Sequence, residues 1–254
     1  MANTYFQFKQ FIVHQEQTAM KVCTDACLFG AWVAHDISSS NEDSQKTINS
    51  IVDIGTGTGL LSLMLAQATS TQPNPAKIIA IEIEPNAASE AETNFKASPW
   101  NDRIELTQAA VQNFTKTRVD KFDCVITNPP FYEGDLHSPD VQKNLASHST
   151  ALPWVTLVNE VKQLLNEDSY YYVLVPALRA YTMQKLASQN ELQLIEEVVV
   201  YNADKQKPFR VFQKYKHSSI NIIEIKRSNF FIKNELNEYT PDFINLLAPY
   251  YLHL

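Results

Sequence analysis

The sequence predicts an α/β fold built on a doubly wound, mostly parallel sheet. Short apolar runs rich in β-branched residues alternate with longer segments of helical pattern, and no internal repeat interrupts this order. A glycine-rich turn joins the first such strand to its helix, and an Asn-Pro-Pro-Phe turn follows a later strand. Both turns fall at the carboxyl ends of strands, where open α/β sheets bind their ligands.

Seven strands and five helices are expected from the alternation. The strands are 51–54, 77–83, 103–106, 122–127, 170–175, 192–201 and 219–226, and the helices are 26–34, 60–68, 85–96, 153–165 and 178–186. The last two strands have no helix between them, which predicts an antiparallel pair at one edge of the sheet. The polar, serine-rich segment 36–49 has the composition of a surface linker. We expect an N-terminal extension (1–35), a main domain (36–228) and a C-terminal tail (229–254).

Composition is that of an ordinary globular protein. Of the 254 residues, 44% are hydrophobic and 19% are charged, and no apolar run approaches membrane-spanning length. Residues 1–10 lack the apolar region of a signal peptide. The three cysteines are too few for a disulfide framework and lack histidine or cysteine neighbours at metal-ligand spacing. The expectation is a reduced, cytoplasmic monomer with no membrane contact and no metal.

The charge is unevenly distributed. The net charge of −7 argues mildly against nucleic acid, yet residues 201–233 hold eight Lys and Arg against Asp204 and Glu224. Such a stretch attracts phosphates locally, but a solvated basic hairpin without a partner would have the same composition. Both interpretations stay open on charge alone.

The glycine turn runs from Asp53 through Gly55, Gly57 and Gly59. Glycines there let the backbone approach a ligand, and the following helix offers free N–H groups. The dinucleotide pattern G-x-G-x-x-G would need glycine at position 60, where Leu60 stands, and no Gly-Lys-Ser/Thr follows. The remaining pattern is D-x-G-x-G-x-G.

The second motif, Asn128-Pro129-Pro130-Phe131, follows a buried strand. The two prolines end the strand and fix a rigid turn, because neither has an N–H to donate. Asn128 contributes a side-chain carbonyl and Phe131 a flat aromatic face. Together they would hold a planar group that carries an amine.

With Glu82 at the end of the second strand, the glycine turn resembles the cofactor loop of class I S-adenosylmethionine-dependent methyltransferases. That resemblance implies a Rossmann-like seven-stranded sheet, S-adenosylmethionine as cofactor, and Glu82 as the acceptor for the ribose hydroxyls, with Glu84 as its rival. Asn128-Pro129-Pro130-Phe131 matches the (D/N/S)-P-P-(Y/F/W) motif of amino-methyltransferases. The resemblance implies that the carbonyls of Asn128 and Pro129 orient the amine, that Phe131 stacks on its plane, and that Asn128 also borders the cofactor.

Residues 6–11 and 20–32 resemble the amino-terminal signature of bacterial tRNA (adenine-N6)-methyltransferases, and the likeness extends to about Arg227. That family modifies the adenosine immediately 3′ of the anticodon in a valine tRNA. The resemblance places Lys21 and Thr24 beside the methionine end of the cofactor, although Thr24 or Asp25 would equally serve as a helix cap. It also implies that Lys205, Lys207 and Arg210 contact RNA phosphates, and that the loop 132–150, with His137, Lys143 and His148, closes over the base.

Two departures from the family pattern stand out. Relatives usually place an Asp for the cofactor's adenine after the third strand, where this chain has Gln108-Ala109-Ala110-Val111. Cys23 and Cys27 stand where relatives often carry glycine, and we expect both to be small packing residues without an activated thiolate.

Two other functions remain open. A protein glutamine-N5 methyltransferase would use the same Asn-Pro-Pro-aromatic geometry on an amide. A cofactor-binding module of an RNA complex, without catalysis, is disfavoured by the intact Asn128 and prolines.

Overall fold

The computed structural model describes residues 3–18, 20–39, 47–130, 152–204, 206–218 and 224–254. Within these residues, one eight-stranded sheet has the order β10-β8-β9-β7-β6-β3-β4-β5. Its strands are β3 (Ser50–Ile54), β4 (Lys77–Glu82), β5 (Ile104–Gln108), β6 (Phe122–Thr127), β7 (Leu165–Pro176), β8 (Leu192–Ala203), β9 (Arg210–His217) and β10 (Lys226–Lys233). The helices are α1 (Thr24–Ser39), α2 (Leu60–Thr69), α3 (Pro85–Ala97), α4 (Val111–Thr117), α6 (Trp154–Leu164), α7 (Ala180–Ser188) and α8 (Pro241–Leu247), with a short 3₁₀ turn η1 (Ala177–Arg179).

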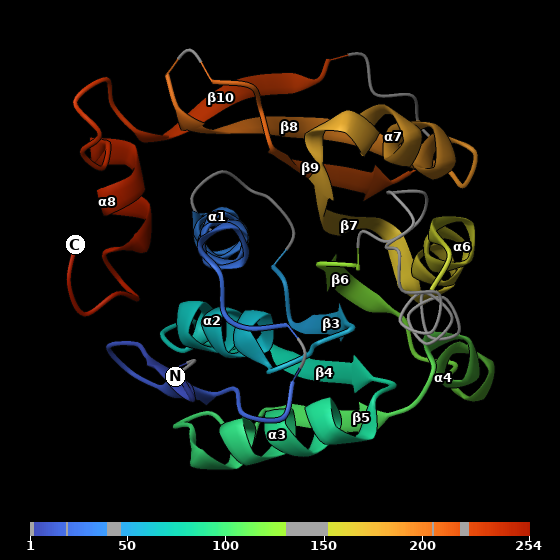
Figure 1. The fold of residues 1–254 in the computed structure, drawn as a ribbon. Coiled ribbons are helices and arrows are strands. Elements are labelled where there is room, and N and C mark those ends of the chain that lie inside the picture. The colour runs from blue at the N-terminus through green and yellow to red at the C-terminus, as the bar shows by residue number, and fades with distance from the viewer. Residues whose placement is uncertain (1–2, 19, 40–46, 131–151, 205, 219–223) are drawn as a thin grey trace, which may run out of the picture.

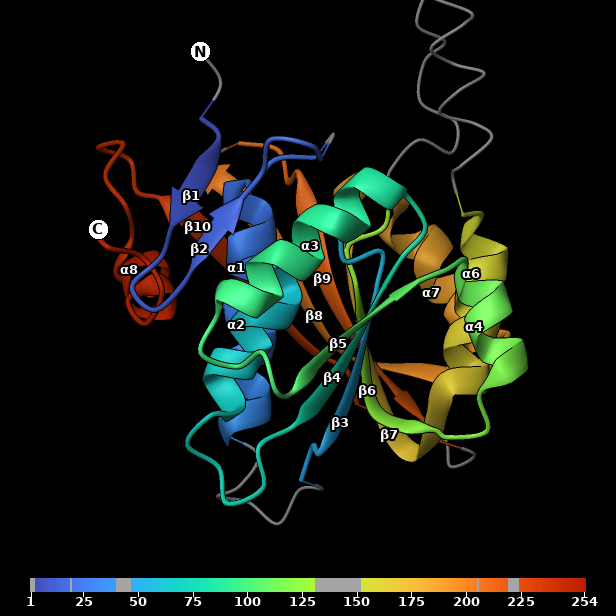
Figure 2. The same ribbon diagram turned by 90° about the horizontal axis from the view of Figure 1, so that it is seen from below.

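The sheet has helices on both faces, so the predicted doubly wound α/β class is confirmed. Helices α1, α2 and α3 cover one face, and α4, α6 and α7 cover the other (Figures 1 and 2). Alternate side chains of β7 serve the two cores: Tyr172 and Leu174 enter the first, while Tyr171 and Val173 enter the second. This two-residue alternation explains why the central strands read as unbroken apolar runs.

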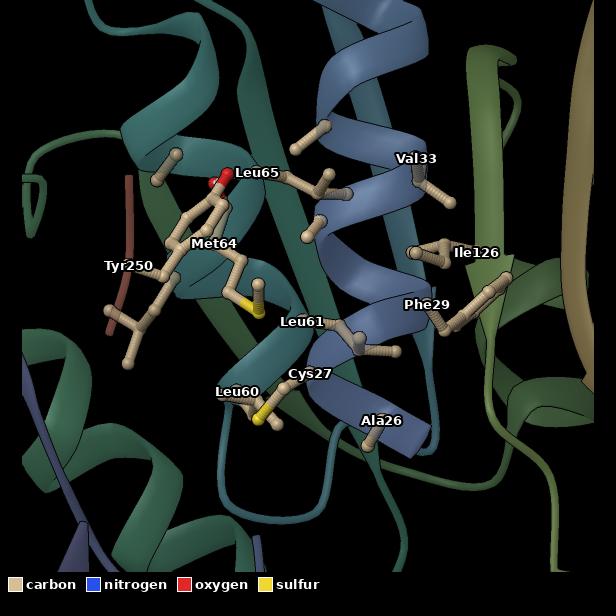
Figure 3. Close-up of a cluster of buried hydrophobic side chains, with 14 of the residues drawn as sticks. Ala26, Cys27, Phe29, Val33, Leu60, Leu61, Met64, Leu65, Ile126 and Tyr250 are labelled. Atoms are coloured by element: carbon tan, nitrogen blue, oxygen red, sulfur yellow. Dashed lines mark hydrogen bonds between the residues drawn. The ribbon is translucent and has the colours of Figure 1, made fainter. Parts of the chain in front are cut away.

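Helix α1 lies directly on α2 in the first core. Figure 3 shows their contact, with Phe29 and Val33 of α1 turned toward Ile126 of the sheet. Gly30 permits the close approach, since a Cβ at that position would lie 2.7 Å from the sulfur of Met64. The helix is longer than predicted, because it continues through the polar residues up to Ser39.

A buried charge pair fixes α1 to the sheet. Lys214 of β9 is 6% exposed and donates to Asp36 of α1 at 2.7 Å, and the Tyr172 hydroxyl donates to the same carboxylate oxygen at 2.5 Å. The Lys214 ammonium also lies 4.5 Å from the centre of the Tyr170 ring. One of the basic residues in the 201–233 stretch is therefore part of the core.

The end of the sheet differs from the prediction. The basic stretch expected between two strands is itself the strand β9, which pairs antiparallel with both β7 and β8. The antiparallel strand thus lies inside the sheet, and an eighth strand, β10, pairs parallel with β8 at the edge. The predicted strand 219–226 lies mostly outside the described residues. Strand β10 also crosses the predicted domain boundary at 228, and the domain division stays a prediction.

Three elements carried too weak a pattern to be predicted. Strands β1 (Tyr5–Gln7) and β2 (Ile12–His14) form a hairpin of three-residue strands, and α4 has only seven residues. The hairpin is anchored by its aromatic residues: Phe8 is 1% exposed, and the Lys9 N–H donates to the Tyr250 carbonyl at 2.8 Å.

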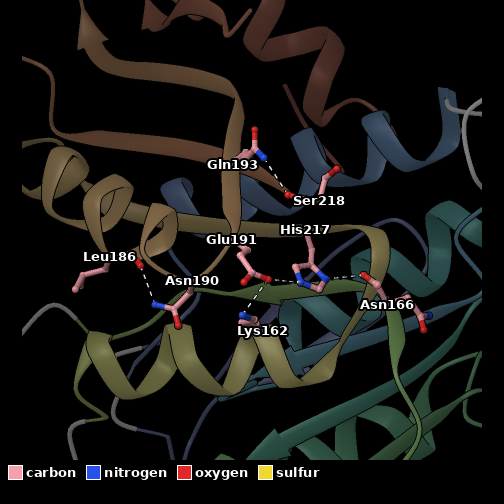
Figure 4. A network of polar contacts seen from close by, with 8 residues as sticks. All are labelled: Lys162, Asn166, Leu186, Asn190, Glu191, Gln193, His217 and Ser218. Carbon is pink, nitrogen blue, oxygen red and sulfur yellow. Dashed lines mark hydrogen bonds and ion pairs between the residues drawn. The ribbon is translucent and has the colours of Figure 1, made fainter. Parts of the chain in front are cut away.

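The amino edge of β8 is closed by a polar network (Figure 4). Glu191 accepts from Lys162 at 3.0 Å, and His217 lies against the Asn166 carbonyl at 2.9 Å. These contacts join β7, β8 and β9 at the end of the sheet away from both sequence motifs. Both sequence motifs lie at the opposite end of the strands.

Candidate functional site

The two motifs meet at the switch point of the sheet. From β3 the chain winds outward through β4 and β5, then returns to β6 on the other side of β3. Ile54 and Thr127 are register partners at the carboxyl ends of β3 and β6, and the Thr127 hydroxyl donates to the Ile54 carbonyl at 2.8 Å. Gly55 and Asn128, the next residues, therefore leave the sheet side by side. Open α/β sheets bind their ligands in this crevice.

The glycine loop needs glycine for two different reasons. Gly55, Gly57 and Gly59 all have positive φ, at 71°, 56° and 84°. A Cβ at Gly59 would lie 2.4 Å from the Phe95 ring, so packing excludes any side chain there. At Gly55 and Gly57 a Cβ would meet nothing within 4 Å. Open space in front of a tight loop is the geometry a closely approaching ligand requires.

Asp53 is fully buried below this loop. Its Oδ2 accepts hydrogen bonds from the hydroxyls of Thr56 at 2.6 Å and Ser62 at 2.8 Å, while its Oδ1 has no partner among the described residues. Burial raises the pKa of this carboxyl to about 6, although the two hydroxyl bonds act in the opposite direction. An unpartnered carboxylate oxygen of this kind fits a cationic or N–H donor.

Glu82, at the carboxyl end of β4, supports the loop from the other side. Its Oε2 accepts from the Gly57 N–H at 2.9 Å, and its Oε1 accepts from the Ile83 and Glu84 N–H groups, each at 2.9 Å. A carboxylate has about four acceptor positions, so capacity remains for a ligand hydroxyl. Its rival Glu84 instead caps α3, accepting from the Asn86 and Ala87 N–H groups.

Asn128 has an unpartnered acceptor at the same edge. Its Oδ1 is buried and has no hydrogen-bond partner among the described residues. Pro129 is buried and Pro130 half-buried, which holds the turn in place. Phe131 and the loop 132–150 lie outside the described residues, so their predicted contacts with the base stay predictions.

The predicted N-terminal contacts lie at the start of α1. Thr24 is the first residue of the helix and is exposed, and the Lys21 ammonium donates to the Gln15 carbonyl. Asp25 forms an ion pair with Arg210, with 2.7 Å between Oδ2 and Nε. The cofactor roles of Lys21 and Thr24 stay predictions.

Most of the basic stretch is matched by carboxylates. Besides Lys214 and Arg210, three of its cations have acidic partners: Lys216 with Asp168, Lys226 with Glu196, and Arg227 with Glu197. Lys207 is exposed in the turn before β9, and Lys205 lies outside the described residues. The local excess of positive charge seen in the sequence is thus much smaller on the folded surface.

The end of β5 offers backbone groups but no acidic side chain. The Ala109 N–H donates to the Glu82 carbonyl at 2.9 Å, and Gln108 is exposed. An adenine bound here would therefore meet backbone groups rather than a carboxylate.

Neither Cys23 nor Cys27 has a thiol with a lowered pKa. Burial raises the pKa of the Cys27 thiol to about 12, and partial desolvation beside the Asp25 carboxylate raises that of Cys23. Cys27 is a packing residue, as predicted. Cys23 is exposed, so the prediction that it is a packing residue was wrong.

Two polar residues of α3 were missed by the sequence analysis. Glu90 and Asn94, one turn apart, hold residues 14–18 by side-chain hydrogen bonds. Their partners are backbone groups some 75 positions away in the chain, and no sequence motif signals such a contact.

Among the described residues, no group of three or more His, Cys, Asp or Glu could hold a metal ion. None of the described helices is both long enough and apolar enough to cross a membrane.

Comparison with known proteins gives one consistent result. The family model "Methyltransferase small domain" matches residues 31–152. Curated proteins named tRNA1(Val) (adenine(37)-N6)-methyltransferase are similar over essentially the full length. The protein of Dyadobacter fermentans is 36% identical over 98% of this chain and 98% of its own length. That of Flavobacterium johnsoniae is also 36% identical, over 98% of this chain and 100% of its own length. That of Cytophaga hutchinsonii is 33% identical over the whole of both chains.

Solved structures agree at the level of the fold. A predicted O-methyltransferase from Agrobacterium tumefaciens superposes with a TM-score of 0.65 at 14% identity, over 89% of this chain and 96% of that one. A putative class I S-adenosylmethionine-dependent methyltransferase from Listeria monocytogenes gives 0.60 at 14% identity, over 92% and 70%. These likenesses confirm the class I methyltransferase fold.

Proposed function

Since the chain belongs to the tRNA1(Val) (adenine(37)-N6)-methyltransferase family, we propose that it methylates the N6 amine of adenosine 37 in a valine tRNA. The protein is an S-adenosylmethionine-dependent enzyme of the methyltransferase small-domain type. We expect it to act in the cytoplasm as a monomer. Sedimentation of the purified protein would check its oligomeric state.

The observation that carries the proposal is the unpartnered Oδ1 of Asn128 beside the glycine loop. An exocyclic adenine amine has two N–H groups, and the carbonyls of Asn128 and Pro129 supply two acceptors on a rigid turn. Accepting both hydrogens turns the nitrogen lone pair out of the base plane. Positioning of this kind supplies most of the rate enhancement when no covalent intermediate forms.

The loop residues fit S-adenosylmethionine. When bound, it supplies an activated methyl group on a sulfonium centre. The unpartnered Asp53 Oδ1 suits its ammonium group, and the remaining acceptor positions of Glu82 suit its ribose hydroxyls. The open space at Gly55 and Gly57 leaves room for its methionine part.

The substrate base must leave its stack to reach Asn128. Unstacking is cheapest in a single-stranded anticodon loop, which agrees with the tRNA substrate named for the relatives. Lys207 and Lys205 would then contact phosphates. Arg210 contributes less, because Asp25 already neutralises its charge.

The rival acceptor is a protein glutamine. A side-chain amide is also planar and presents two N–H groups, so the Asn128 turn alone does not discriminate between amide and adenine. The relatives' shared name favours RNA.

Incubation with methyl-labelled S-adenosylmethionine decides between the two acceptors. We expect label in valine tRNA as N6-methyladenosine, and its absence from a transcript with guanosine at position 37. Label on a protein glutamine, with tRNA unlabelled, would overturn the proposal.

A further inference from the structure

The segment between β2 and α1 is held at both of its ends. We call residues 14–18 and 20–25 the strap. At its first end, the Glu90 carboxylate of α3 accepts hydrogen bonds from three consecutive backbone N–H groups: Glu16, Gln17 at 2.9 Å and Thr18 at 3.0 Å. The Thr18 hydroxyl adds a fourth bond at 2.8 Å. Glu90 is 5% exposed, so these bonds form away from solvent competition.

The charge on Glu90 is part of this attachment. Burial alone would raise the pKa of its carboxyl, but the N–H donors outweigh burial and lower it below the ordinary value. Hydrogen bonds to an ionised acceptor are about twice as strong as those between neutral groups. The first end of the strap therefore depends on a negative charge at position 90.

Asn94, one turn further along α3, links the strap to the glycine loop. Its side chain exchanges two hydrogen bonds with the backbone of His14, accepting from the N–H and donating to the carbonyl, each at 2.9 Å. The same amide donates to the Thr58 carbonyl at 2.9 Å. One buried side chain thus contacts both the strap and the loop that precedes α2.

The second end is the ion pair between Asp25 and Arg210. Arg210 is the register partner of Pro176, the last residue of β7, so this pair lies at the carboxyl edge of the sheet. Both side chains are largely buried, at 13% and 25% exposure. Removing one partner of a partly shielded pair is costly, because it leaves the other charge without compensation.

The strap therefore passes the start of α2. Helix α1 packs on α2, and the chain from β2 runs from α3 to the first turn of α1 at the carboxyl side of the sheet (Figures 1 and 2). The glycine loop and the beginning of α2 lie between these two points of attachment.

Anchoring the hairpin β1–β2 does not account for Glu90. The hairpin is already fixed by the buried rings of Phe8 and Phe11 and by the bond from Lys9 to Tyr250. The four bonds to Glu90 instead fix the residues that follow the hairpin.

We propose that Glu90 and the Asp25–Arg210 pair are positioning residues that hold the strap beside the glycine loop and thereby tighten cofactor binding. The proposal relies on the proposed function only for the identity of the ligand at that loop. It assigns Arg210 to the cofactor side of the site rather than to RNA.

Titration of S-adenosylmethionine into the RNA-free protein by calorimetry tests this role. We expect E90Q and D25N each to weaken binding about tenfold. In a separate methylation assay with tRNA, kcat at saturating cofactor should stay within about twofold of the wild type. The matched control is E92Q, on the same helix, because the Glu92 carboxylate pairs with the exposed Lys96 at 2.7 Å and its loss should leave affinity unchanged.

Circular dichroism establishes that each variant is folded. Should E90Q fail to fold, T18V takes its place, because it removes only the hydroxyl bond and should weaken binding about threefold. Cofactor affinity in folded E90Q or T18V equal to that of E92Q would overturn the proposal. Because the cofactor affinity is measured without RNA, this affinity does not depend on whether tRNA is the substrate.

Discussion

At the residue scale, the buried carboxylate of Asp53 lowers the stability of the fold at neutral pH. Its pKa is raised to about 6 by burial, against an ordinary value of 3.8. The folded protein thus keeps a proton that the unfolded chain loses between about pH 4 and pH 6. The contribution of Asp53 to stability therefore falls as pH rises through that window, by roughly 3 kcal/mol in total.

D53N should remove this penalty. We expect the variant to be about 1–3 kcal/mol more stable than the wild type at pH 7.5, with the difference shrinking toward pH 4, as measured by urea unfolding at both pH values. Its affinity for S-adenosylmethionine should fall, because the acceptor for the ammonium has lost its charge. A variant less stable than the wild type at pH 7.5 would contradict the burial argument.

Candidate site residues could be predicted from the sequence only where a motif carried them. Asp53, Glu82 and Asn128 follow from strand ends and glycine spacing, and the structure brings all three to one crevice. Glu90 and Asn94 could not be found in this way, since their partners are backbone groups set by the fold. The pairing of Arg210 with Asp25 was equally invisible, because it joins residues 185 positions apart.

At the element scale, the glycines of the loop differ in what surrounds them. A Cβ added at Gly59 would lie 2.4 Å from the Phe95 ring, whereas a Cβ added at Gly55 would meet nothing within 4 Å. Both have positive φ, which costs a non-glycine residue about 1–2 kcal/mol.

Alanine at Gly59 and alanine at Gly55 should therefore differ in their effects on stability and on cofactor binding. G59A should lose about 2–4 kcal/mol of stability, because Phe95 must move in addition to the backbone cost. G55A should lose only about 1–2 kcal/mol but bind S-adenosylmethionine far more weakly, since its methyl group enters the ligand's space. Thermal unfolding and calorimetry measure the two effects; equal stability losses, with cofactor affinity intact in G55A, would refute this division.

The strands of the sheet up to β8 were predictable from the sequence, whereas β9 and β10 were not. Strands β3, β4 and β6 are buried on both faces and show as continuous apolar runs. Strand β9 carries Lys214 and Lys216 among its residues, so its sequence looked like a solvated loop. Pairing of Lys214 with Asp36 on α1 is a tertiary contact, and it is what allows a lysine inside this sheet.

At the scale of the whole molecule, folding redistributes the charge. The basic stretch appeared as a local excess in the sequence, but the structure gives most of its cations an acidic partner. What remains for RNA is a smaller set of exposed cations at the carboxyl edge, such as Lys207. Whole-chain electrostatics thus supports the RNA proposal less than the motif geometry does.

K207A should weaken tRNA binding and reduce the slope of log affinity against log salt by about 1, because one phosphate contact is lost. The control is K216A, at the other end of β9, where the cation pairs with Asp168 at 2.7 Å. Filter binding across a range of salt concentrations measures both. Equal slopes for the two variants would show that the amino end of β9, at the carboxyl edge of the sheet, does not contact RNA.

We propose that the Asn128 carbonyl, fixed beside the glycine loop, orients the adenine amine for methyl transfer. Single-turnover methylation of valine tRNA by N128A, with S-adenosylmethionine affinity measured in parallel, tests it most directly. We expect the rate of N6-methyladenosine formation to fall by about 10²–10³-fold while cofactor affinity stays within about threefold of the wild type. Methylation by N128A at the wild-type rate would contradict this role of the Asn128 carbonyl.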